Sequence, residues 1–536
     1  MNQLVLSVKK FFSSSSLIIS VSLFLLIPFY IFLYKAYSPR VNAFGCFDDC
    51  FNIVGGYFMI HGRGLYSQIF FNHQPLMPII SFLIQKSVNA INIYDLILRH
   101  RQVLLLFSFF MNAFLIMRFK WKGVAFTVFY ELTKFFLFGD RFLAEGFIVY
   151  PITYVMGVIW YKYQGKHVYS IEYFFAALTA WFVIAMREPY AILAVLLFIA
   201  LLLGKKSLLV KVSAVFIFLT FTIGTFLVMP INDYIFDVFR VNLSTEFIGE
   251  INATGLLSPY GQLIMWLYPI NILISPNNWN FYRDFVVFLD FIFLFALSFF
   301  LIFSKKRKGI LVMFILFGFA NLRISIPGTA FFGAFHLLPW YGMFILFTCL
   351  LIDEVWNLKK LLAIPLIGLF IVLIGYVSFS PHTFLYDKVD PQAEFLKNFG
   401  NDLQVGEVVR ILAQPTDTLF LDGADDLIYW QAKVLSPYKY SWYTSVMPLF
   451  PVYRKARLDM FSTNPPDFYY GSCPKQKIPN RTLPDNVKND YVQFYSDGKP
   501  TCLYARKEKV VTFTQDQLSI INTWRYQLPQ VKSNGI

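Results

Sequence analysis

The sequence predicts a polytopic α-helical membrane protein of about eleven transmembrane helices with a C-terminal mixed α/β domain outside the cytoplasm. Three observations support this fold class. Of the 536 residues, 57% are hydrophobic and 20% aromatic, whereas only 15% are charged. Apolar runs long enough to cross a bilayer recur up to about residue 380. Beyond that point the charge density rises and short β-type runs alternate with turn residues.

Each membrane span is predicted from the length of an apolar run, because about 20 residues in a helix cross the hydrocarbon core. A soluble chain would instead build its core from amphipathic helices and short strands, so that class is excluded. The first run is long and no small-residue cleavage site follows it, so we expect an uncleaved anchor. The predicted spans cover residues 17–34, 102–118, 123–138, 142–161, 171–186, 189–204, 208–229, 284–303, 309–326, 335–352 and 361–379.

The orientation follows from the loops that are rich in Lys and Arg, which stay on the cytoplasmic side. Such clusters occur after alternate spans, and they place the N-terminus in the cytoplasm and everything after about residue 380 outside. We therefore expect a multi-pass protein of the cytoplasmic membrane. The net charge of +14 is then mostly explained by topology and contact with anionic lipid, and no nucleic-acid partner is expected. The clusters are Lys9 and Lys10, Arg118 to Lys122, Lys162 and Lys166, Lys205 and Lys206, Lys305 to Lys308, and Lys359 and Lys360.

The chain divides by composition into a membrane module, residues 1–380, and an outer domain, residues 381–536. The membrane module contains a first outer loop of about 35–100 and a second large one of about 230–283. In the outer domain we expect strands near 418–422, 467–471 and 502–506. Possible helices near 391–399 and 425–433 alternate with them, which favours a mixed sheet. The length is sufficient for one small core.

The five cysteines fall into two groups. Cys349 lies in a predicted span and is expected to be an inert, small core residue. The other four face an oxidising compartment on this topology. Cys473 and Cys502 are a plausible disulfide pair in the outer domain, and Cys46 and Cys50 are a less strongly supported candidate pair. Zinc at Cys46 and Cys50 is disfavoured, because no His lies at a usual ligand spacing.

The first outer loop carries paired carboxylates. Asp48 and Asp49 follow the first span and are succeeded by glycines, Tyr66 and the segment from His73 to Leu76. A charged carboxylate is costly close to hydrocarbon, so two in succession indicate a site lined with water. The alternative is structural, since an Asp-Asp pair can cap or solvate a helix end.

Several arginines lie on the outer side, where topology alone does not require them. The guanidinium fork matches phosphate oxygens, so these residues are candidates for binding a lipid phosphate. In the alternative interpretation each pairs with a neighbour, as Arg141 with Asp140, Arg187 with Glu188 and Arg283 with Asp284. The residues are Arg99, Arg101, Arg141, Arg187, Arg283 and Arg323.

The run from Asp48 to Leu76 resembles the first outer loop of the GT-C superfamily of integral-membrane glycosyltransferases, which includes protein mannosyltransferases and the aminoarabinose transferase that modifies lipid A. In that family an Asp-Glu pair ends the first span, and a Gly-containing stretch, a Tyr and an aromatic, His and Pro-Leu segment follow. The motifs FLAEGFIVYP, FFGAFHLLPW and NPPDFYYG extend the resemblance over most of the chain. Two positions depart from the family: Asp49 replaces the usual Glu, and Gln68 stands where many members carry Asp.

The resemblance implies the transfer of a sugar from a polyprenyl-phosphate donor to an acceptor hydroxyl on the outer side, with inversion at the anomeric carbon. Asp48 would be the general base, and Asp49 would orient it or bind the acceptor. Positive charge or a metal would stabilise the leaving phosphate. The residues implied for the phosphate are Arg99, Arg101, Arg323 and His336. Those implied for other substrate contacts are Tyr66, His73, Gln74, Arg141 and Glu145.

The expected partners are a polyprenyl-phosphate sugar, membrane lipid and an acceptor that is a lipid, a polysaccharide or a protein. No P-loop or dinucleotide fingerprint occurs, so no nucleotide is expected. A divalent metal is left open, and no other cofactor is required. The main alternative is a transporter or flippase of lipid-linked sugars, which would bind a similar substrate without bond cleavage. Against it, the sequence shows no clear internal repeat. A non-catalytic envelope subunit would have lost the carboxylate pair.

Overall fold

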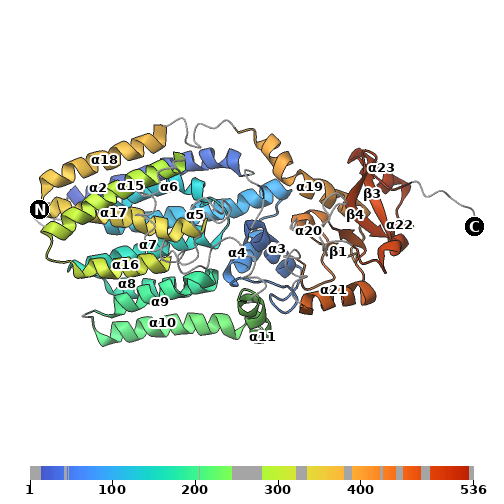
Figure 1. Ribbon diagram of the computed structural model, residues 1–536, viewed down its shortest axis with the longest axis horizontal. Coiled ribbons are helices and arrows are strands. Elements are labelled where there is room, and N and C mark those ends of the chain that lie inside the picture. The colour runs from blue at the N-terminus through green and yellow to red at the C-terminus, as the bar shows by residue number, and fades with distance from the viewer. Residues whose placement is uncertain are drawn as a thin grey trace, which may run out of the picture. The chain divides into compact units, whose positions relative to one another are not determined.

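The computed structural model describes residues 14–41, 45, 48–204, 206–243, 281–320, 335–379, 389–422, 427–441, 451–471 and 483–529. The chain is mostly helical, with a small mixed sheet near the C-terminus (Figure 1). Its contacts divide it into two compact units. Unit 1 comprises residues 1–39, 101–228 and 250–389, and unit 2 comprises residues 40–100, 229–249 and 390–536. Unit 2 therefore combines three segments that are distant in the sequence.

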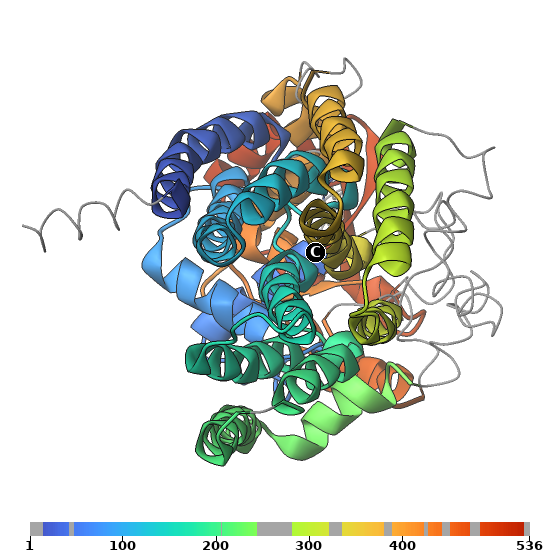
Figure 2. The ribbon, with the colours of Figure 1, turned by 90° about the vertical axis from the view of Figure 1, so that its left-hand side faces the viewer.

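Unit 1 is a helical bundle whose helices are seen nearly end on in Figure 2. A helix lies at each of the eleven places where the sequence predicts a span. Helix α5 begins in the residues of unit 2 and continues into unit 1. The helices are α2 (Ser14–Tyr37), α5 (Ile93–Phe119), α6 (Trp121–Thr133), α7 (Ala144–Tyr163), α8 (Ser170–Met186), α9 (Ala191–Leu202), α10 (Leu208–Leu227), α15 (Phe281–Phe303), α16 (Lys308–Ala320), α17 (Leu338–Leu358) and α18 (Lys360–Phe379).

Helix α17 is the core of this bundle. It packs against α6, α7, α15, α16 and α18, and its apolar window is buried throughout. Small residues allow this close packing. A Cβ at Gly342 would lie only 2.3 Å from a methyl carbon of Val149 on α7, so the two helices approach closely because that side chain is absent.

Six of the helices in the described part of the chain are long and apolar enough to cross a membrane. Large apolar side chains are exposed on some of them, including Leu208 and Phe216 on α10 and Leu361 on α18. Extended apolar surface of this kind is costly in water. The apolar helices are thus compatible with a membrane protein, whereas the count of eleven spans and the orientation remain predictions. The six segments are Ile19–Arg40, Ile93–Phe119, Leu208–Leu227, Phe285–Phe303, Phe335–Leu358 and Lys360–Phe379.

In unit 2, helices α3 (Asp48–Ile60) and α4 (Leu76–Ser87) pack tightly against each other. A Cβ at Gly56 would lie 2.5 Å from the Ser81 hydroxyl oxygen and 2.7 Å from the Phe82 nitrogen. This contact requires glycine. The Ser81 hydroxyl is also 2.9 Å from Nε2 of His100 on α5, so the same serine joins three helices.

The sheet of unit 2 has five strands in the order β1-β2-β4-β3-β5. Strands β1 and β2 are parallel and the other neighbours are antiparallel, which confirms the predicted mixed sheet. The strands expected near 418–422, 467–471 and 502–506 are present as β1, β2 and β4. The sequence analysis missed β3 and β5. The strands are β1 (Leu419–Leu421), β2 (Phe468–Tyr470), β3 (Tyr491–Ser496), β4 (Lys499–Arg506) and β5 (Tyr526–Gln527).

The hairpin between β3 and β4 has a local explanation. Asp497 and Gly498, which connect the strands, have φ angles of +50° and +73°. An Asp-Gly pair with two positive φ values makes the tight turn whose twist matches antiparallel strands. The Asp-Gly dipeptide is the signal that could have located β3 from the sequence.

The helices of the C-terminal segment differ in length from the prediction. Helix α19 (Pro391–Leu412) begins where a helix was expected but is longer. Asp390 caps it, since its carboxylate accepts bonds from the Gln392 and Ala393 amides. Helix α20 (Leu427–Ala432) matches the second expected helix. Helices α21 (Pro451–Thr463) and α23 (Gln515–Thr523) were not predicted. The short elements of unit 2 are α11 (Ile231–Tyr234), the π-helical η4 (Ile235–Arg240), η9 (Lys488–Asp490) and α22 (Lys507–Val510).

Candidate functional site

The paired carboxylates open helix α3. Asp48 is its first residue and Asp49 its second, and the side chain of Asp48 lies outside the described part of the structure. Asp49 is only 1% exposed. An acidic residue in the first turn interacts favourably with the helix N-terminus. The sequence therefore places a buried carboxylate at the point where the predicted first outer loop becomes helical.

The segment from Tyr66 to Gln74 folds back on itself in the same unit. Tyr66 is fully buried with a φ of +66°, and its hydroxyl donates to the His73 carbonyl at 2.9 Å. The His73 ring lies edge-on to Phe51 of α3, with 5.7 Å between ring centroids. Tyr234 donates to the Gln74 side-chain oxygen at 3.0 Å. Three predicted substrate residues, Tyr66, His73 and Gln74, thus lie together and are buried.

Residues 229–243 pack on this segment and contribute a residue that the sequence analysis missed. The Phe71 amide donates to an Asp237 carboxylate oxygen at 3.4 Å, and Asn242 donates to the Asn72 carbonyl at 2.6 Å. Asp237 is fully buried. It lies in a π-helical turn, a form that often marks functional positions. No sequence pattern indicated the π-helical turn, so the sequence analysis had no signal that pointed to Asp237.

The environment of Asp237 favours its protonated form. Burial raises the pKa of this carboxyl to about 8, although the nearby Lys439 and the Phe71 amide oppose that shift and Asp233 adds to it. Lys439 itself pairs with Asp233 at 2.8 Å. Burial raises the pKa of the Tyr440 and Tyr453 phenols, and the Asp237 carboxylate adds to that rise. A carboxyl with a pKa near neutrality can both donate and accept a proton.

A second polar cluster lies in unit 1. Glu145, in the first turn of α7, accepts from Arg187 Nε at 3.1 Å and lies 2.9 Å from His336 Nδ1. Tyr190 donates to the His336 carbonyl at 2.8 Å. Glu145 and Arg187 are nearly inaccessible. The structure therefore brings together two predicted site residues, Glu145 and His336, with an arginine that the sequence had marked as unusual.

The remaining predicted phosphate-binding arginines do not form one cluster in the described residues. Arg99 is partly exposed and pairs with Asp95, one turn away, at 3.0 Å. Arg101 is buried, and a nitrogen of its guanidinium group lies 3.5 Å from an Asp140 carboxylate oxygen. The alternative interpretation of the sequence had paired Asp140 with Arg141 instead. The Arg141 guanidinium lies 5.2 Å from the centre of the Phe138 ring. Arg323 lies outside the described residues.

A further buried ion pair in unit 1 was also missed. Lys134 Nζ lies 2.6 Å from a Glu131 carboxylate oxygen, and both side chains are inaccessible. Tyr150 and Asn112 donate to the other oxygen of Glu131 at 2.6 and 2.9 Å. Both charges stand within the predicted span 123–138, and their presence in an apolar run is a signal that could have identified them.

The cysteines agree in part with expectation. Cys349 is free and buried. Cys50 and Cys502 both form disulfides, and their predicted partners, Cys46 and Cys473, lie outside the described residues. Among the residues that the structure describes, no group of three or more His, Cys, Asp or Glu side chains is arranged to hold a metal ion.

Comparison of the chain with protein-family models, with curated proteins and with solved structures gave no match.

Proposed function

We propose that this chain is a membrane glycosyltransferase that moves a sugar from a polyprenyl-phosphate donor to an acceptor hydroxyl on the outer side of the cytoplasmic membrane. The observation that carries the proposal is the pair of consecutive carboxylates at the start of α3, in a folded loop that follows an apolar helix. Tyr66, His73 and Gln74, the other residues of the resemblance in this loop, are buried in the same unit.

In the proposed reaction the oxygen of the acceptor hydroxyl attacks the anomeric carbon of the donor sugar. The bond between that carbon and the phosphate oxygen breaks, and the electron pair leaves with the polyprenyl phosphate. The proton of the hydroxyl passes to the Asp48 carboxylate, because a hydroxyl is a poor nucleophile unless a base takes its proton. A single displacement of this kind inverts the configuration. Asp49 orients the base or the acceptor.

The leaving phosphate gains negative charge as the bond breaks, so positive groups near it lower the barrier. The resemblance proposes Arg99, Arg101, Arg323 and His336 for this role, although Arg99 and Arg101 pair with Asp95 and Asp140 in the structure. Nδ1 of His336 lies 2.9 Å from a Glu145 carboxylate oxygen, and this contact orients the imidazole ring. Arg141 and Glu145 are proposed to shape the sugar site.

The test is sugar transfer from a panel of labelled polyprenyl-phosphate sugars by the purified protein in liposomes. Asp48→Asn should lower turnover at least about a hundredfold, the usual contribution of a general base, while donor binding is retained. Asp390→Asn is the matched control, because Asn replaces Asp as a helix cap at little cost. Unchanged turnover in Asp48→Asn would refute its role as the base.

A transporter or flippase of lipid-linked sugars is the second candidate. The observation that favours it is the buried network of Glu131, Lys134, Tyr150 and Asn112, because ionisable groups inside membrane helices often mark a transport or proton pathway. The liposome assay separates the two functions. Movement of intact labelled lipid across the bilayer without cleavage, unaffected by Asp48→Asn, would identify a transporter and refute the glycosyltransferase.

A further inference from the structure

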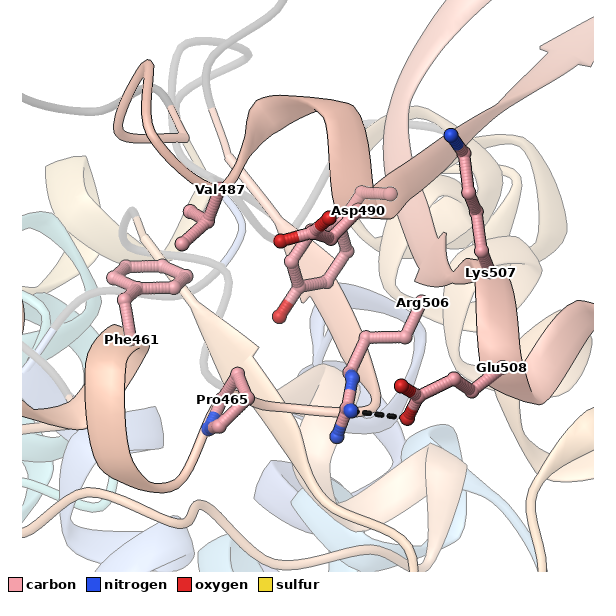
Figure 3. A pocket seen from close by; sticks show the side chains of 8 residues that line it. Phe461, Pro465, Val487, Asp490, Arg506, Lys507 and Glu508 are labelled. Carbon is pink, nitrogen blue, oxygen red and sulfur yellow. Dashed lines mark hydrogen bonds and ion pairs between the residues drawn. The ribbon is translucent and has the colours of Figure 1, made fainter.

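A pocket of about 380 Å³ lies in the sheet-bearing part of unit 2, between the end of α21, the residues that lead into β3, and the end of β4. Phe461 and Val487 lie on one side of it and Arg506 and Glu508 on the other (Figure 3). Its volume falls within the range of roughly 300–1,000 Å³ typical of small-molecule sites, close to the lower end. The pocket therefore suits a ligand of the size of a short saccharide.

The floor of the pocket is apolar and fixed in place. Phe461, Val487 and Tyr491 line it and are buried in one hydrophobic cluster with Phe420 and Tyr469. The Tyr491 hydroxyl donates to the Pro466 carbonyl at 2.6 Å, which holds this side chain in position. Because the same residues form the core of the domain, the floor exists before any ligand binds.

The rim of the pocket is charged but balanced. Asp490 and Glu508 carry negative charge, and Arg506 and Lys507 carry positive charge. Arg506 forms an ion pair with Glu508, so its charge is largely neutralised. A site for a phosphate or a carboxylate would have an excess of basic groups. The two basic and two acidic side chains of this rim balance each other, which argues against an anionic ligand.

Asp490 and Lys507 lie at the exposed edge of the pocket. Among the described residues their side-chain polar atoms take part in no hydrogen bond or ion pair. A carboxylate only accepts hydrogen bonds and an ammonium only donates them, whereas a sugar hydroxyl does both. One acceptor and one donor at the edge of an apolar floor therefore match a polyhydroxylated ring, which has apolar C–H faces and hydroxyls around its rim.

We propose that this pocket binds a neutral saccharide. The sugar ring packs on Phe461 and Tyr491, and its hydroxyls bind Asp490 and Lys507. That the saccharide is the acceptor of the transfer reaction, or part of a larger acceptor, rests on the proposed function. Binding itself does not depend on that function.

The experiment is saturation-transfer NMR on the full-length protein in nanodiscs, with a panel of neutral mono- and disaccharides as ligands. Inorganic phosphate and a short zwitterionic peptide serve as competitors. Asp490→Ala and Lys507→Ala should each weaken saccharide binding about tenfold, because each removes a hydrogen bond to a charged group. Asp516→Ala and Lys499→Ala, exposed charges of the same segment outside the pocket, should leave binding unchanged. The floor residues are kept intact, since truncating them would also disturb the core.

Saccharide binding that is lost in the two rim variants and retained in the controls supports the proposal. Absence of binding to every sugar at millimolar concentration, or displacement of the sugar by phosphate or by the peptide at lower concentration than the sugar itself requires, overturns it. If no variant or parent transfers sugar but the pocket still binds saccharide, the proposed function fails and the binding site stands.

Discussion

The buried carboxylates of the described residues differ in what surrounds them. Glu145 is held by Arg187 and His336, and Glu131 by Lys134 with two neutral donors. Asp237 has only the Phe71 amide at 3.4 Å, and the nearby Lys439 is paired with Asp233. A buried carboxylate with a cationic partner can stay charged, whereas one with weak compensation is more stable protonated. Asp237 is therefore a buried carboxylate outside the predicted membrane spans whose charge should respond to pH.

This difference predicts a pH effect on stability. The pKa of Asp237 is about 8 in the folded protein and near the usual 3.8 when unfolded. Between these values the folded state holds a proton that the unfolded state releases. Stability is therefore fullest at low pH and falls as pH rises towards 8, by at most about 1.4 kcal/mol per pH unit.

Asp237→Asn should remove the part of the pH dependence of stability that arises from this carboxyl group. We expect the melting temperature of the variant in detergent to fall less than that of the parent when pH is raised from 5 to 8. Scanning fluorimetry at a series of pH values measures this, with Asp516→Asn, an exposed carboxylate, as the control. Identical pH dependence in parent and Asp237→Asn would contradict the assignment. Lys439, Asp233, Tyr440 and Tyr453 are the ionisable groups that interact with Asp237, and they are unchanged in the variant.

At the scale of elements, glycines decide how closely helices pack. Gly56 allows α3 to contact α4 at Ser81 and Phe82, whereas Gly400 on α19 has no atom within 4 Å of where its Cβ would lie. Both are in helices of unit 2. The same substitution should therefore have opposite effects at the two positions, since alanine favours a helix by roughly 1 kcal/mol over glycine where nothing obstructs it.

Gly56→Ala is expected to destabilise unit 2 by about 1–3 kcal/mol, because a methyl group must displace the Ser81 side chain and the Phe82 backbone. Gly400→Ala should be neutral or stabilising. Thermal melting of the two variants in parallel checks the prediction. A higher melting temperature for Gly56→Ala would show that α3 and α4 do not pack as described.

At the scale of the whole molecule, the apolar helices of unit 1 and the sheet of unit 2 suit different solvents. Large apolar side chains are exposed on α10 and α18, whereas α19 and α21 expose mostly polar and charged ones. Apolar surface is stable in lipid and polar surface in water. Together with the Lys and Arg clusters, this contrast predicts that the C-terminal segment lies outside the cytoplasm.

Cysteine labelling in intact cells tests this topology. Lys499→Cys, in the exposed part of β4, should react with a membrane-impermeant maleimide. Lys360→Cys, at the start of α18, should react only after the cells are opened. The buried free Cys349 should contribute little background, because its thiol is inaccessible. The reverse pattern would invert the predicted orientation.

The sequence by itself determined what depends on local composition. Long apolar runs predicted helices at eleven places, since a membrane or buried helix needs continuous apolar length. Strands β1, β2 and β4 followed from β-type runs between turn residues. The two-residue β5 and the polar helix α21 have too little hydrophobic periodicity to be predicted from the sequence. Strand β3 was missed although the Asp-Gly dipeptide that follows it is a known hairpin signal.

Only the tertiary structure decided which polar groups meet. Asp237 bonds the Phe71 amide 166 positions away, and His336 reaches Glu145 across 191 positions. Residue type, together with the resemblance of their motifs to a known family, marked Asp49, Tyr66, His73, Glu145 and His336 as candidates, but it did not indicate their partners. Such pairings depend on helix packing, which the sum of many small, non-directional apolar contacts determines. A single sequence does not show which of these contacts form, so the polar pairings are seen only in the folded chain.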